Sequence, residues 1–79
     1  MRILDEKSDK AVDRVTLLLL RSEAEELRDK LRCLLSDGEL RHEHIPSEDF
    51  QKEITVALYD PARIEGFHER CQRLIKEDK

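Results

Sequence analysis

The chain contains two stretches in which an apolar strand pattern runs directly into an amphipathic helix pattern. The first begins with Val12 and Val15 and continues into four consecutive leucines, residues 17–20. The second, E-I-T-V-A-L-Y over residues 53–59, alternates between two faces. β-Branched residues and a period of two both favour strands, so we expect strands over about 13–20 and 53–59. The two faces of the second strand carry, in turn, Ile54, Val56 and Leu58, and Thr55, Ala57 and Tyr59.

Helix signals follow each predicted strand. Ser22 and Glu25 form the capping-box pattern S-x-x-E, and Gly38 is a natural stop for the helix that begins there. Asp60 followed by Pro61 is typical of a second helix start, although a start near Phe67 stays open. The apolar residues recur at helical spacing in both segments: Ala24, Leu27, Leu31, Leu34 and Leu35, then Ile64, Phe67, Cys71, Leu74 and Ile75.

Two weaker strand patterns precede the strong ones. Residues 2–7 can pair with 12–20, and residues 41–45 can pair with 53–59. The sequence therefore predicts an α+β fold with a small, mainly antiparallel four-stranded sheet and two helices on one face. The expected order is strand-strand-helix-strand-strand-helix. An alternative makes 13–20 and 53–59 parallel neighbours through a right-handed crossover.

The two strand–helix stretches also resemble each other. Val15-Thr16-Leu17 matches Ile54-Thr55-Val56, and the apolar helix positions match at nearly the same offset. This similarity is compatible with a duplicated strand–helix unit. It is equally compatible with two generic units whose apolar spacing agrees by chance.

Composition limits the size and class of the protein. Seventy-nine residues, 38% hydrophobic and 43% charged, predict a single small domain over residues 1–79 with a modest core. The formal net charge of −4 argues against binding to nucleic acid through a basic face, because such proteins neutralise phosphates with Lys and Arg. No stretch is apolar enough for a membrane span, the N-terminus is too charged for a signal peptide, and we expect a cytoplasmic protein. Its two cysteines, Cys33 and Cys71, are expected to be free thiols.

The second face of the predicted sheet is unusually apolar for a face exposed to water. Antiparallel sheets with one wet face normally alternate apolar and polar residues, and an apolar patch on a small domain often marks an interaction surface. We therefore expect a homodimer that buries this face; the alternative is that the N-terminal segment covers it. The predicted interface residues are Thr16, Leu18, Leu20, Thr55, Ala57 and Tyr59.

Histidine and cysteine are the only metal-ligand types with suggestive spacing. His42 and His44 share a strand face, and His68 lies one helical turn from Cys71. Together they offer the four nitrogen and sulfur ligands of a zinc site. Ordinary surface histidines and a cysteine that belongs to an apolar stripe explain the same residues, so we expect no metal and no cofactor.

The loop of residues 43–50, E-H-I-P-S-E-D-F, admits two interpretations. It could be an acidic recognition loop. We prefer a structural role in which Ile45 and Phe50 close the end of the core and the acids remain in water.

The sequence contains no glycine-rich phosphate loop and no Cys-x-x-Cys motif. Cys33 with a histidine is the only nucleophile set, and nothing in its surroundings in the sequence activates it strongly. We therefore expect a small cytoplasmic interaction or regulatory module, homodimeric and without catalytic activity. A nucleic-acid-associated accessory protein and a metal-binding protein that uses His42, His44, His68 and Cys71 remain alternatives.

Overall fold

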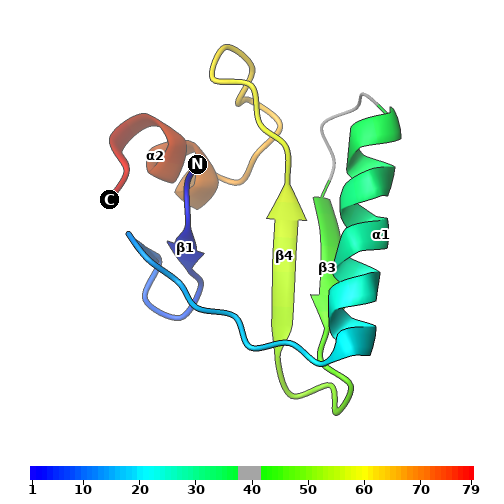
Figure 1. Cartoon of the computed structure of the whole chain (residues 1–79). Coiled ribbons are helices and arrows are strands. Elements are labelled where there is room, and N and C mark those ends of the chain that lie inside the picture. Colours follow the sequence, from blue (N-terminus) through cyan, green and yellow to red (C-terminus); the bar gives the residue numbers. More distant parts are fainter. Residues whose placement is uncertain (38–41) are drawn as a thin grey trace. The chain divides into compact units, whose positions relative to one another are not determined.

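The structure, a computed structural model, describes residues 1–37 and 42–79. Its elements confirm the α+β class and the order strand-strand-helix-strand-strand-helix (Figure 1). In chain order they are β1 (Leu4–Asp5), β2 (Lys10–Ala11), α1 (Arg21–Asp37), β3 (His42–Pro46), β4 (Glu53–Ala57) and α2 (Glu69–Glu77).

The chain divides into two compact units. The first combines Met1–Leu17 with Tyr59–Lys79, and the second is the continuous segment Leu18–Leu58. The described strands pair as two separate antiparallel sheets, β1 with β2 and β3 with β4, whereas the sequence predicted one shared sheet.

The predicted strand over 13–20 is wrong. Residues 12–20 have no regular secondary structure, with a bend at Asp13, and they join neither sheet in the described part of the chain. The pairing of the β2 segment with the β1 segment ends at Val12, whose N–H donates to the Ile3 carbonyl. The apolar alternation of this stretch therefore lacks the partner strand that a ladder needs. This also removes the structural basis for a duplicated unit, because residues 54–56 lie in a strand and 15–17 do not.

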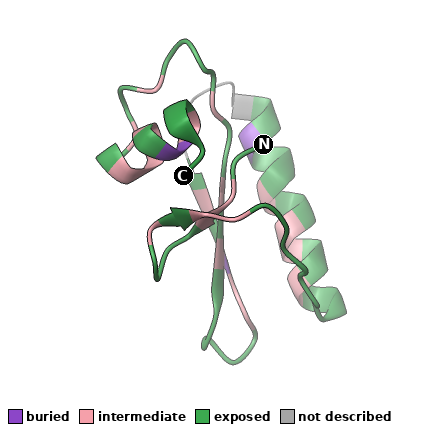
Figure 2. Ribbon diagram, turned by 90° about the vertical axis from the view of Figure 1, so that its left-hand side faces the viewer, coloured by how far each residue is buried: buried purple, intermediate pink, exposed green. Residues whose placement is uncertain are grey.

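The second unit is a helix packed on a β-hairpin. Ile45 of β3 lies opposite Ile54 of β4, and Glu43 lies opposite Val56. These residues are buried or half-buried, and their neighbours along both strands are mostly exposed (Figure 2). Since α1 packs against β3, the half-buried positions face the helix. Leu34 of α1 is 1% exposed and, with Ile45, forms the centre of this small core.

The start of α1 is fixed by Glu23 rather than by the predicted Ser22–Glu25 box. The helix begins at Arg21. The Leu20 N–H donates to Glu23 Oε1 at 2.8 Å. Glu23 is the third residue of the helix, the position from which a glutamate side chain commonly accepts the N–H of the residue before the helix. The Ser22 hydroxyl instead donates to Glu48. Glu25 forms an ion pair with Arg21 at 3.3 Å. The predicted stop at Gly38 and the predicted strand start at Arg41 lie outside the described residues.

The turn between β3 and β4 is closed by its own polar groups. The Ser47 N–H donates to the Lys52 carbonyl at 2.9 Å, and the Phe50 N–H donates to the Ser47 carbonyl at 3.0 Å. This turn places Phe50 at φ 58° with its side chain 79% exposed. The prediction that Ile45 is a core residue is confirmed. The prediction for Phe50 is wrong, because the backbone conformation of the tight turn leaves its side chain in water.

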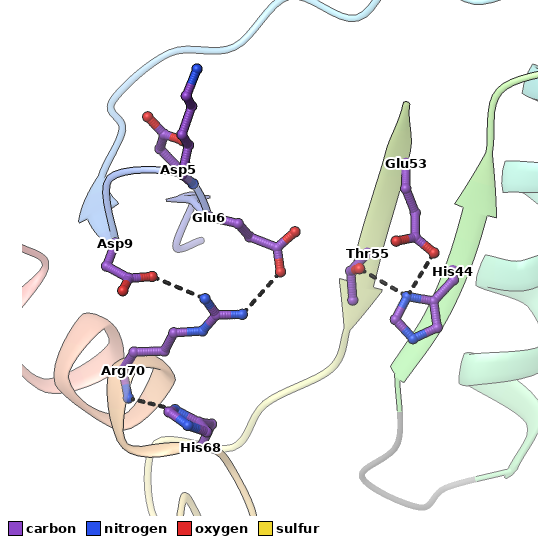
Figure 3. A network of polar contacts seen from close by, with 9 residues as sticks. Asp5, Glu6, Asp9, His44, Glu53, Thr55, His68 and Arg70 are labelled. Atoms are coloured by element: carbon purple, nitrogen blue, oxygen red, sulfur yellow. Dashed lines mark hydrogen bonds and ion pairs between the residues drawn. The ribbon is translucent and has the colours of Figure 1, made fainter. Parts of the chain in front are cut away.

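In the first unit, arginines of α2 hold the β1–β2 hairpin. The Arg70 guanidinium lies 2.9 Å from Asp9 and 3.1 Å from Glu6 (Figure 3). Arg73 adds a hydrogen bond to the Asp9 carbonyl at 3.0 Å. The carboxylate of Asp9 raises the pKa of Arg70, chiefly through the direct hydrogen bond. These contacts fasten the N-terminal hairpin to the helix.

The second helix starts later than Asp60–Pro61. Asp60 accepts the Ala62 N–H at 2.9 Å and forms a bridge with Arg63, which makes a local turn. α2 begins at Glu69, capped by His68, whose Nδ1 accepts the Arg70 N–H. The alternative start near Phe67 is the better prediction. Neither described helix is long and apolar enough to cross a membrane.

Candidate functional site

Three consecutive exposed leucines, Leu18–Leu20, precede α1 in the second unit, and we call them the leucine segment. Its side chains are 90%, 36% and 56% exposed, in chain order. Val15 and Leu17, which precede it in the first unit, are exposed as well. Exposed leucines are common singly, whereas contiguous exposed apolar residues are more typical of interaction surfaces.

Part of the backbone of the leucine segment is free of hydrogen bonds. Among the described residues, the N–H and C=O groups of Leu18 and Leu19 make no hydrogen bond within the chain. Free backbone donors and acceptors are available to pair with a strand of another chain.

Glu23 holds the end of this segment in place. Its two carboxylate oxygens accept the Leu20 N–H at 2.8 Å and the Glu48 N–H at 2.9 Å. One side chain thus ties the leucine segment to the start of α1 and to the β3–β4 turn. The surface is therefore presented by a hydrogen-bonded framework.

A second exposed surface is the side of the β3–β4 hairpin that faces away from α1. It carries two histidines with ring centroids 5.0 Å apart and rings inclined by 80°. His44 Nδ1 lies 3.0 Å from Thr55 Oγ1 and 3.3 Å from Glu53 Oε1 (Figure 3). The residues of this open face are His42, His44, Glu53, Thr55 and Ala57.

Asp49 organises the turn below this face. The Ser47 hydroxyl donates to the Asp49 carboxylate at 2.6 Å, and the Gln51 N–H donates to it at 3.0 Å. Both bonds stabilise the charged form, so they lower the pKa of Asp49 below 3.8, with the hydroxyl as the larger cause. Asp5 is similar in the first hairpin, where the Lys7 N–H and then the Ser8 hydroxyl lower its pKa.

The six predicted interface residues do not form one sheet face. Thr55 and Ala57 lie on the open face of the hairpin, whereas Leu18 and Leu20 lie in the leucine segment. Thr16 and Tyr59 belong to the first unit. The shared face required a strand over 13–20, which does not form. Leu18 and Leu20 are exposed, and the participation of all six residues in a dimer stays a prediction.

The four predicted metal ligands are divided between the units. His42 and His44 belong to the second unit, and His68 and Cys71 to the first. His68 caps α2, and Cys71 is half-buried. Within residues 1–37 and 42–79, no group of three or more His, Cys, Asp or Glu side chains is arranged to hold a metal ion. Cys33 is exposed on α1.

Sequence reasoning missed Glu23 and Arg70. Glu23 follows Leu20 by three residues, which is the spacing of a capping glutamate. The sequence also contains the same spacing between Ser22 and Glu25, and the prediction used that pair. Arg70 offered no local signal, because its partners Asp9 and Glu6 lie more than sixty positions away.

Comparisons with protein-family models, with curated proteins and with solved structures find no match to this chain.

Proposed function

We propose that the chain is a protein-interaction module without catalytic activity, and that it forms a homodimer through the leucine segment. The observation that carries the proposal is the exposure of Leu18 and Leu20, 90% and 56%, beside a backbone with free hydrogen-bonding groups. The sequence favours a strand here, and the described fold supplies no strand partner. A second copy of the chain supplies one.

The apolar area is consistent with a weak, reversible dimer. Complete burial of a leucine side chain contributes about 1.5–3 kcal/mol. Covering the exposed fractions of the leucine segment would therefore contribute roughly 3–5 kcal/mol per copy. A two-fold interface uses the same patch on both copies and doubles this gain. A micromolar dimer needs about 8 kcal/mol in excess of the entropic cost of association, which is itself several kcal/mol. The leucine segment alone therefore supports a dimer weaker than micromolar, and we expect assembly to depend on concentration.

Charge does not oppose this contact. The net charge of −4 disfavours close approach of two copies in general, but residues 15–20 contain no ionisable side chain. The nearest charged residues along the chain, Arg14 and Arg21, are cationic. The contact surface is thus free of the repulsion that acts elsewhere between acidic copies.

The test compares two glutamate substitutions by light scattering at matched concentrations. Leu18→Glu places a charge on the proposed interface, so we expect it to shift the protein to a monomer of 9.4 kDa. Leu35→Glu is the matched control, because Leu35 is also an exposed leucine, 73%, but lies on α1. Equal effects of the two substitutions, or no effect of Leu18→Glu on a dimer, would contradict the proposal. Circular dichroism checks that both variants fold.

A further inference from the structure

The open face of the β3–β4 hairpin presents a pair of imidazole rings held close together. His42 and His44 are separated by one residue on β3, so their side chains leave the same face of the strand. Their ring centroids lie 5.0 Å apart. With metal–nitrogen bonds of about 2 Å, two imidazoles on one tetrahedral ion have centroids about 5 Å apart.

The surroundings of His44 select the tautomer that binds metal. Its Nδ1 lies 3.3 Å from Glu53 Oε1 and shares a hydrogen bond with Thr55 Oγ1 (Figure 3). A lone pair on Nδ1 would face the carboxylate and be repelled, so the carboxylate favours a hydrogen on Nδ1. The lone pair of the neutral ring then lies on Nε2. Metal-ligating histidines commonly have this arrangement, with the other ring nitrogen hydrogen-bonded to a carboxylate.

The residue between the two histidines does not compete for the ion. Glu43 faces the other side of the strand, where its carboxylate forms an ion pair with Lys30 of α1 at 3.5 Å. Both histidines are exposed and their rings stand edge to face, inclined by 80°, so binding requires the side chains to rotate until a nitrogen of each ring reaches the ion. The face is open to water, which can complete the coordination.

From this geometry we propose that His42 and His44 bind a divalent transition-metal ion, Cu²⁺ or Zn²⁺, with Glu53 as the positioning residue. Imidazole suits these ions, whereas Mg²⁺ and Ca²⁺ prefer oxygen. The site uses two protein nitrogens, and solvent completes the coordination. It is independent of the leucine segment and needs one copy of the chain only.

The test is titration of tag-free protein with ZnCl₂ by calorimetry, followed by the same titration of single variants. We expect one ion per chain, at least a tenfold loss of affinity in His42→Asn and in His44→Asn, and no competition from excess MgCl₂. Glu53→Gln should weaken binding by about 10-fold, as at other supported histidines. His68→Asn is the matched control: it removes the third histidine, keeps a side chain that caps helices, and should bind as the unaltered chain does.

A spectroscopic measurement addresses ligand identity directly. The electron paramagnetic resonance spectrum of the Cu²⁺-loaded protein should show coupling to two imidazole nitrogens, and His44→Asn should lose one of them. Failure of the unaltered chain to bind Zn²⁺ and Cu²⁺ would overturn the proposal. Unchanged affinity in His42→Asn or His44→Asn, or an equal loss in His68→Asn, would overturn it as well.

Discussion

Two adjacent leucines on α1 provide a sharp test of where the core of the second unit lies. Leu34 is 1% exposed and Leu35 is 73% exposed. Leucine-to-alanine substitution in a core costs about 2–5 kcal/mol, because it removes buried methyl groups and leaves a cavity. The same change on a surface costs within about 0.5 kcal/mol. We therefore expect Leu34→Ala to lower the free energy of unfolding by about 3 kcal/mol, and Leu35→Ala to leave it almost unchanged.

Such a loss is large for a chain of this size. At about 0.1 kcal/mol per residue, a 79-residue protein has a free energy of unfolding of roughly 8 kcal/mol. The assay is urea unfolding followed by circular dichroism, which reports mainly on the longer helix, α1. All proteins must be measured at one concentration, because dimerisation adds to the apparent stability. Equal losses in the two variants would refute the placement of Leu34 between α1 and β3.

The other predictions concern charged groups. Arg70→Met removes the contacts to Asp9 and Glu6; we expect a lower free energy of unfolding and faster hydrogen exchange at Val12, with Arg28→Met as the exposed control. A stability loss in Arg70→Met no larger than in Arg28→Met would count against the network. Asp49 has a lowered pKa because Ser47 and Gln51 donate to its carboxylate. Its contribution should therefore be complete above pH 3.8 and disappear as the pH falls through the lower folded pKa. An NMR titration of the Asp49 carboxyl with a midpoint at or above 3.8 would contradict this.

The local features of the fold were readable from the sequence where one short pattern determines them. The alternation of Ile54 and Val56 identified β4, and the spacing of Leu27, Leu31 and Leu34 identified α1. Local signals also located both weak strands, β1 and β3, approximately. Each of these elements depends on residues within one turn or one strand.

Features that depend on distant partners were not readable. Residues 13–20 have an apolar pattern typical of a strand, but a strand also needs a neighbour, and the described chain provides none. Phe50 looked like a core residue until the turn hydrogen bonds from Ser47 placed it in water. For the same reason, the predicted interface combined residues that belong to different units.

The candidate metal site was predictable from the sequence only in part. In the sequence, the spacing of His42 and His44 on a strand and of His68 and Cys71 on a helix suggested one set of four ligands. The structure assigns the two pairs to different units and shows that Glu53 and Thr55 lie next to His44. These contacts cross between strands, so the residues along β3 alone could not reveal them.

The mass of the unaltered chain in solution tests the central claim most directly. Light scattering should be recorded across a wide range of protein concentration, with and without a chelator, so that metal binding and dimerisation are separated. We predict a mass of twice 9.4 kDa at high concentration, falling toward 9.4 kDa on dilution and unaffected by the chelator. A mass of 9.4 kDa at every concentration would contradict dimerisation through the leucine segment.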